Sequence, residues 1–457
     1  MLSDRIRALG SSTFLRSVGT LVGGTVLAQA ITALTLPVIA RLYSPSDFSL
    51  LAVFGGILAV VAVAACLRFD VVIPIPERDE DAVNVLAMSL MWAVVVSVLL
   101  ALVVLGMAET LGGWLNQPRL AANLWLLPIG VLLAGSYSAL QFWCVRKKQF
   151  GRIATTRVGQ SCAGAGVQIG AGWLGFGPIG LLLGQILSTG AGTIGLGGYL
   201  LRDRASLRSI EWTRMRALFR RYDRFPKYST LEALSNSAGI QLPILLISAL
   251  VTGPEAGFLL LAMYVIQAPM GVIGGATSQV FLSRAPAEHR AGRLGLLTES
   301  VLSGLVRAGV GPLLCLGIVA PGLFAIVFGE EWRRSGVLVS WMTPWFIMQF
   351  LAAPVSMALH VANQQKVALV LQVAGLLFRV AAVYGVAGFS RGYVAEAYAL
   401  SGFVFYFFYL ITILRVVAAQ PRRVFADMWG SAAVLALWAG GGVALSFAFE
   451  FASAIFD

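Results

Sequence analysis

The fold is decided by residues 202–227, which read RDRASLRSIEWTRMRALFRRYDRFPK and form the one long polar run in an otherwise apolar chain. This run carries nine basic residues against three acidic ones. Apolar segments long enough to cross a bilayer lie on both sides of it. Because loops rich in Lys and Arg stay on the cytoplasmic side of a membrane, the run predicts the orientation of the chain and divides it into two halves.

Within this run the spacing of residues predicts a short amphipathic helix. Its apolar residues share one helical face: Trp212, Met215, Phe219 and Tyr222. Its arginines share the opposite face: Arg214, Arg216, Arg220 and Arg221. This pattern is typical of a helix that lies at an anionic membrane surface. The alternative is an unstructured basic linker.

Composition places the chain among polytopic helical membrane proteins. Of 457 residues, 58% are hydrophobic and 12% are charged, and the mean hydropathy is +0.84. Soluble domains carry about 25% charged residues. The apolar runs are far longer than the segments of about 10 alternating residues that form barrel strands. The net charge of +12 collects in alternate loops, which argues against nucleic acid as a partner. We expect the first apolar run to remain as a helix, because it is too long for a signal peptide.

Breaks in hydrophobicity predict thirteen spans: 13–41, 47–75, 82–110, 119–145, 153–173, 178–201, 228–252, 256–283, 297–328, 336–361, 367–388, 392–416 and 427–449. With the N-terminus in the cytoplasm, 25 Lys and Arg residues lie inside, including Arg146, and 5 lie outside, including Arg334, as the positive-inside rule requires. The predicted domains are a six-helix bundle (1–201), the basic cytoplasmic linker (202–227), a second six-helix bundle (228–418) and an extra segment (419–457). The thirteenth span is the uncertain one, because it could instead lie along the surface.

Polar residues within the spans are the candidates for function, since a charge at the bilayer centre costs about 3 kcal/mol or more. Arg307 and Arg379 lie roughly 15 Å from the inner ends of their spans at 1.5 Å per residue. The other candidates for the lining of a cavity are uncharged or acidic: Glu232, Asn236, Gln241 and Gln29. A wet cavity with arginines and few acids attracts an anion such as phosphate. The alternative for each arginine is a pair with Glu232 or a backbone carbonyl.

Catalysis within the chain is not expected. His289 and His360 lack companions at ligand spacing, and the four cysteines show no metal-ligand pattern. No Gly-rich phosphate loop with Lys and Ser/Thr is present. The predicted outer loops are about ten residues or shorter, too small for an outer catalytic domain. We therefore expect a protein that is not an enzyme and holds neither a metal nor a cofactor.

The two halves begin alike, which predicts a structural repeat. QAITALTLP (29–37) and SNSAGIQLP (235–243) each run from a polar half-helix into Leu-Pro and a tight hairpin. Transporters are often built from duplicated bundles. Six prolines are expected to interrupt spans: Pro37, Pro128, Pro243, Pro269, Pro312 and Pro354. Each removes a backbone N–H and bends a helix.

Several passages resemble one known group. RFDVVIPIP (68–76) with ERDED (77–81) resembles the end of the second helix in polysaccharide-export flippases. The seventh and eighth helices of the same group are similar to these passages: YDRFPKYS (222–229), QLP (241–243), GPEAG (253–257) and SQVF (278–281). The group comprises O-antigen and oligosaccharide flippases of the multidrug/oligosaccharidyl-lipid/polysaccharide exporter superfamily.

The resemblance implies two pseudo-symmetric six-helix bundles around a central cavity, working by alternating access. It implies a bacterial inner-membrane protein that moves a polyprenyl-diphosphate-linked glycan to the periplasmic leaflet. Its partners would be membrane lipids, this lipid-linked glycan and other polysaccharide-assembly proteins, with H⁺ or Na⁺ as a coupling ion that the sequence leaves unassigned. Two alternatives remain. A cation-coupled multidrug exporter would need acidic residues in the cavity, and a glycan polymerase or ligase would need a large outer loop.

Overall fold

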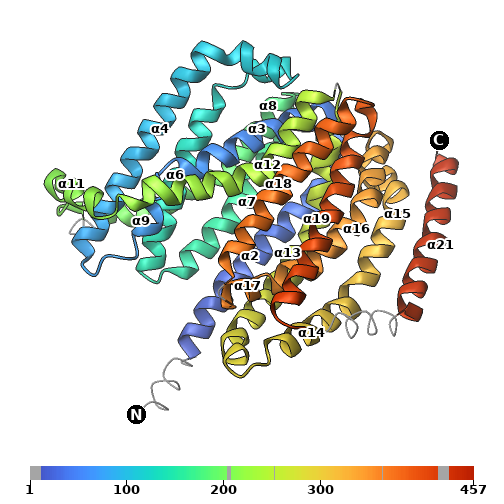
Figure 1. Ribbon diagram of the computed structural model, residues 1–457. Helices are drawn as coiled ribbons and strands as arrows, with labels where there is room; N and C mark the ends of the chain where they lie inside the picture. Colours follow the sequence, from blue (N-terminus) through green and yellow to red (C-terminus); the bar gives the residue numbers. More distant parts are fainter. Residues whose placement is uncertain (1–11, 203–206, 252, 363, 420–431, 457) are drawn as a thin grey trace. The chain divides into compact units, whose positions relative to one another are not determined.

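The computed structural model describes residues 12–202, 207–251, 253–362, 364–419 and 432–456. Over these ranges the regular structure is helical (Figure 1). The chain forms two compact units, residues 1–249 and residues 250–457. Each unit is built from membrane-length helices joined by short turns, as expected where backbone polar groups must be satisfied without water.

The first unit contains the following elements: α2 (Ser12–Leu42), α3 (Pro45–Ala64), η1 (Asp70–Val72), α4 (Asp79–Trp114), α5 (Pro118–Ala121), α6 (Leu126–Arg146), α7 (Phe150–Trp173), α8 (Pro178–Gly190), α9 (Gly192–Arg202), α11 (Trp212–Arg221), η2 (Phe225–Ser229) and α12 (Thr230–Leu250). Its largest contacts pair α2 with α7 and α7 with α8. Between α2 and α7 the approach is close, because a Cβ on Gly24 would lie 2.5 Å from Ala154.

The second unit contains the remaining elements: α13 (Glu255–Arg290), α14 (Leu294–Leu305), η3 (Val306–Val310), α15 (Gly311–Phe328), η4 (Glu330–Trp332), α16 (Arg333–Val355), α17 (Met357–Val361), α18 (Gln365–Ala387), η5 (Arg391–Tyr393), α19 (Val394–Val416) and α21 (Ala432–Phe456). Helix α16 packs against α13, α15 and α19. It carries the buried centre of this unit, including Trp345 and Phe346.

Eleven helices in the described part of the chain are long and apolar enough to cross a membrane. The other two predicted spans, 153–173 and 256–283, are also helical and lie within α7 and α13. Helix α7 is the more polar of these, with Arg152, Arg157, Gln160 and Gln168 in its sequence. The chain is therefore a polytopic all-α membrane protein, as predicted.

Local chemistry explains where helices begin. Ser44 and Asp47 form a capping box at the start of α3, and Pro45 occupies the first turn, where a missing N–H costs nothing. The predicted span 119–145 begins later than expected, because α6 starts at Leu126. Pro128 therefore stands in a first turn and does not interrupt a span. The predicted span 47–75 also ends early, because Leu67 and Arg68 take positive φ angles of 47° and 61° after α3.

The span Leu294–Phe328 is divided by a π-helical turn. Helix α14 runs into η3 (Val306–Val310), and α15 follows with Pro312 near its start. Proline lacks the N–H that would continue the regular ladder, which accounts for the irregular turn just before it. Single π-turns inside helices occur frequently at functional sites.

The thirteenth predicted segment is a helix, α21, which packs along α15 in the second unit (Figure 1). A Cβ on Gly311 would lie 2.4 Å from the Trp438 ring. Farther along, Phe449 lies over Gly322. Residues 432–449 are long and apolar enough to span a bilayer.

The linker helix predicted between 212 and 222 is present as α11, but its apolar face does not lie open to a membrane. Met215 and Leu218 are buried in the core of the first unit. The Phe219 ring lies 5.5 Å from Phe69 and 6.4 Å from Trp92, measured between centroids. Met215, Phe219 and Tyr222 of the predicted apolar face are thus covered by protein. Trp212 was predicted on the same face, but it is 67% exposed.

The boundary between the compact units lies at the end of α12, after the basic linker. Two hydroxyl groups tie α12 to the first unit: Ser237 donates to the Ala59 carbonyl at 3.2 Å, and Ser248 donates to the Leu115 carbonyl at 3.1 Å. The division into functional halves at 201 and 228, with 419–457 as an added segment, stays a prediction.

Candidate functional site

Four of the sequence-predicted site residues belong to the first unit. Gln29 is exposed on α2, and Glu232 and Asn236 are exposed on α12. Gln241 is half-buried on α12 and lies against α3, where its side-chain oxygen would be 3.7 Å from a Cβ on Gly56. Their role in a cavity stays a prediction.

Arg307 is exposed on the second unit and stands within the π-turn η3. The neighbouring Gly309 packs directly beneath the Phe350 ring, since a Cβ there would lie 2.3 Å from a ring carbon. One side of the turn is therefore packed against Phe350, and Arg307 is exposed on the other side.

Arg379, on α18 of the same unit, is half-buried among aromatic rings. Its guanidinium carbon lies 4.5 Å from the Phe405 centroid, 5.5 Å from Tyr406 and 5.6 Å from Trp345. It also interacts with the hydroxyl of Tyr398. No described carboxylate lies within ion-pair distance of this guanidinium, and its Nε has no hydrogen-bond partner.

Glycine makes room for two of these rings. A Cβ on Gly375 would lie 2.2 Å from Phe405, and a Cβ on Gly402 would lie 2.4 Å from Trp345. Any larger residue at either position would displace a ring that contacts Arg379. The rings and the two glycines together form what we call the Arg379 cage.

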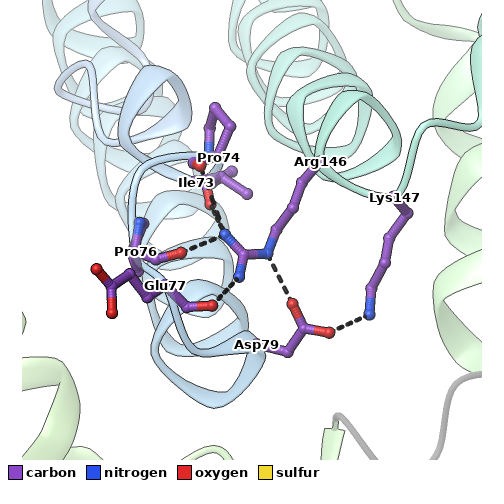
Figure 2. A network of polar contacts seen from close by, with 7 residues as sticks. All are labelled: Ile73, Pro74, Pro76, Glu77, Asp79, Arg146 and Lys147. Carbon is purple, nitrogen blue, oxygen red and sulfur yellow. Dashed lines mark hydrogen bonds and ion pairs between the residues drawn. The ribbon is translucent and has the colours of Figure 1, made fainter. Parts of the chain in front are cut away.

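A second cluster, which the sequence did not reveal, surrounds Arg146 at the end of α6 (Figure 2). The Arg146 guanidinium donates to the Asp79 carboxylate at 2.8 Å and to the Glu77 carbonyl at 3.1 Å. It also donates to the carbonyls of Ile73, Pro74 and Pro76. Lys147 completes the cluster through the second oxygen of Asp79, at 2.7 Å. The Arg146 side chain is 11% exposed.

This cluster explains the motif at residues 68–81. Two prolines in Ile-Pro-Ile-Pro leave the turn with few N–H donors, so its carbonyls cannot be satisfied by local structure. The five donors of one arginine satisfy them from another helix. Residues 73–79 therefore form a turn between α3 and α4 that Arg146 holds against α6.

We expect Arg146→Ala to destabilise the protein by about 2 kcal/mol, because the partly buried carbonyls of Ile73 and Pro76 would lose their donor. Arg146→Lys should restore only part of this, since the ammonium has three donors on one nitrogen, whereas the planar guanidinium has five spread over three nitrogens. Lys147→Ala is the matched control, as its more exposed ion pair should contribute less than about 1 kcal/mol. Thermal unfolding in detergent measures the three variants. Equal effects of Arg146→Ala and Lys147→Ala would contradict the proposed role of Arg146 in stabilising the turn.

A third cluster joins three helix starts in the second unit. Arg334, on α16, lies 2.7 Å from Glu255 on α13 and 2.6 Å from Glu396 on α19. Both acids occupy first turns, where carboxylates interact favourably with the helix dipole. Glu396 is 7% exposed and its second oxygen has no partner. Arg334 therefore compensates a buried negative charge.

A fourth cluster fixes α11 to the start of α4. The amide nitrogen of Asn84, which is fully buried, donates to the carbonyls of Glu80 and Ser209, both at 2.8 Å. The Asn84 side-chain oxygen accepts from the Glu211 N–H at 2.8 Å. Arg214 bridges Glu80 and Glu211, and hydrogen bonding to Glu80 above all raises the pKa of Arg214.

Arg68 and Asp70 lie in the turn after α3. Asp70 is 5% exposed and accepts a hydrogen bond from Ser138 at 2.6 Å. In the described chain, no group of three or more His, Cys, Asp or Glu side chains is placed to hold a metal ion. The contacts around Arg146, Arg334 and Asn84 fix helices to one another.

The sequence profile of the polysaccharide biosynthesis protein family matches residues 38–337, about two thirds of the chain. The chain belongs to this family. None of the curated protein sequences matches it.

Solved structures show which fold this member of the family has. The lipid II flippase MurJ, in an inward closed conformation, superposes with a TM-score of 0.70 at 12% identity, covering 95% of this chain and 98% of MurJ. An inward-facing multidrug resistance transporter of the MATE family, in the MOP superfamily, gives 0.62 at 15% identity, covering 87% and 95%. A MOP superfamily transporter from Pyrococcus furiosus gives 0.53 at 14% identity, covering 88% and 96%. These likenesses confirm the predicted fold class.

Proposed function

We propose that this protein is a flippase that moves a polyprenyl-diphosphate-linked oligosaccharide across the bacterial inner membrane by alternating access. The family match carries the proposal, because it assigns a chain made of membrane-length helices to polysaccharide biosynthesis. A membrane protein of this process that shares its fold with a lipid II flippase is best explained as a carrier of lipid-linked sugar. The repeat unit would be that of an O-antigen or an exopolysaccharide.

The Arg379 cage favours this substrate over a cationic drug. A guanidinium held by ring faces keeps its positive charge without a carboxylate beside it. Such a group attracts a diphosphate and repels a cation. For this reason the multidrug exporter is the second candidate. The glycan polymerase or ligase ranks lower, because the predicted outer loops are short.

The proposed orientation places the N-terminus and the 202–227 linker in the cytoplasm, following the charge of the loops. Arg307, Arg379, Glu232, Asn236, Gln241 and Gln29 remain the proposed cavity residues. Coupling to H⁺ or Na⁺ is part of the proposal with no ion assigned, and other polysaccharide-assembly proteins are proposed partners.

The test is transport by the purified full-length protein in liposomes. We expect a polyprenyl-diphosphate oligosaccharide added to one leaflet to become accessible to a lectin on the other side, faster than in protein-free vesicles. A polyprenyl monophosphate bearing the same glycan should move more slowly, because it offers less negative charge to the arginines. Movement of a cationic dye without movement of the lipid-linked glycan would support the multidrug exporter instead.

A further inference from the structure

We propose that the outward face of α11 binds the headgroups of anionic phospholipids. This site does not depend on which substrate the protein transports. Helix α11 packs against the core of the first unit through Met215, Leu218 and Phe219. Asn84 and Arg214 hold it to α4, so its opposite face has one defined direction.

That opposite face is rich in uncompensated positive charge. Arg216, Arg220 and Arg221 are exposed, and no described carboxylate lies within ion-pair distance of them. The acids nearby are already engaged: Glu80 and Glu211 pair with Arg214. Another acid, Asp223, is hydrogen bonded to Lys227, which lowers the pKa of Asp223. The three arginines are therefore available to an external anion.

The position of α11 along α4 places these arginines near lipid headgroups. Helix α4 has 36 residues and is roughly 54 Å long at 1.5 Å per residue, whereas the hydrocarbon core is about 30 Å thick. Large apolar side chains of α4 are exposed between 94 and 105, which marks the lipid-facing band. The first turns of α4, including residues 82–88, are mostly buried. The contacts of α11 with α4 run from Glu80 to Trp92, so α11 lies along the part of α4 that precedes the lipid-facing band.

An aromatic side chain completes a surface suited to lipid. Trp212 is 67% exposed and precedes Arg216 and Arg220 at intervals of four residues, so all three share one stripe of the helix. Tryptophan is enriched at membrane interfaces, where its ring lies at the level of the headgroups. An acidic protein partner would explain the arginines alone. A phosphodiester headgroup explains both the arginines and the exposed indole beside them.

Native mass spectrometry of the full-length protein tests this site. The protein, released from detergent, is titrated with phosphatidylglycerol or with phosphatidylcholine of the same acyl chains. We expect at least about threefold tighter binding of phosphatidylglycerol, since each arginine near a phosphate contributes to attraction. The triple variant Arg216→Gln, Arg220→Gln, Arg221→Gln should reduce this ratio to about one. Its melting temperature should change little. Among the described residues these side chains make no ion pair with another element, and Arg221 lies only against the ring of the neighbouring Tyr222.

The matched control removes three exposed arginines elsewhere: Arg284→Gln, Arg290→Gln and Arg391→Gln. It makes the same change in net charge and should keep most of the lipid preference. Free glycerol phosphate at millimolar concentration should not displace the lipid, which distinguishes a headgroup site from a site for small phosphates. The proposal is overturned if the α11 triple variant keeps the preference or if both triple variants lose it equally. Equal binding of the two lipids by the unaltered protein would also overturn it and would leave an acidic protein as the partner of α11.

Discussion

Arg334→Ala should lower the melting temperature of the protein by about 5–10 °C, the largest structural effect we expect from a single substitution. Arg334 stands between Glu255 and Glu396. The side chain of Glu396 is 9% exposed and that of Glu255 is 15% exposed. Removing one partner of a buried ion pair costs about 3–5 kcal/mol, because the other charge stays buried without compensation. Here two carboxylates would face each other as well.

The neighbouring Arg333 provides the control. It pairs with Glu330, but its side chain is 36% exposed and that of Glu330 is 58% exposed, so Arg333→Ala should cost less than about 1 kcal/mol. Adding Glu396→Gln to Arg334→Ala should recover part of the lost stability, because the amide carries no charge. Scanning fluorimetry in detergent compares the four proteins. The charge explanation fails if the double variant is no more stable than Arg334→Ala alone.

The sequence was sufficient for the fold class because membrane spans are a local property of composition. A run of about 20 apolar residues predicts a helix whatever its neighbours are. The boundaries were less predictable at the turn after α3, where Leu67 and Arg68 adopt positive φ although neither residue type favours it. At Pro128 a helix start was mistaken for a break, since a proline fits either place.

The clusters were not predictable, because their partners are distant in sequence. Arg146 was counted as a positive charge of an inner loop, and nothing in its own segment indicates that it would bind residues 73–79. Arg334 was likewise assigned to an outer loop, although its acidic partners lie 79 and 62 positions away. The same limit applies to α11. An amphipathic pattern predicts that one face of the helix is buried, but it does not show whether lipid or protein buries that face.

The sequence identified Arg379 as a candidate site residue, and the structure shows which side chains surround it. The rarity of a charge deep within a span identified the residue. The expected alternatives were a carboxylate or a carbonyl, and the structure provides aromatic rings instead. The tryptophan, phenylalanine and tyrosine residues concerned are common in membrane helices. Their sequence alone therefore did not distinguish a cage from ordinary packing.

Arg379→Gln should reduce export of the lipid-linked glycan more than about tenfold if the guanidinium binds the diphosphate. Glutamine keeps hydrogen-bonding capacity but loses the charge. Arg379→Lys should keep a measurable part of export, because it retains the charge and the attraction to the ring faces while losing the planar fork. Arg415→Gln, on the exposed end of α19, is the control and should export normally. Surface polysaccharide in a flippase deletion strain is the measurement, with membrane abundance determined in parallel.

A purely structural role for Arg379 predicts a different order of variants. Contact with aromatic rings contributes about 1–2 kcal/mol in a desolvated place, so loss of the cage should appear as loss of folded protein. Gly375→Ala provides the comparison, because it displaces Phe405 while leaving Arg379 charged. If Arg379 serves only the cage, Gly375→Ala and Arg379→Gln should lower abundance and export together. If it binds substrate, Arg379→Gln should abolish export at normal abundance, whereas Gly375→Ala should reduce both. Normal export by a well-expressed Arg379→Gln variant would remove Arg379 from the substrate site, and the fold assignment would be unaffected because it rests on other residues.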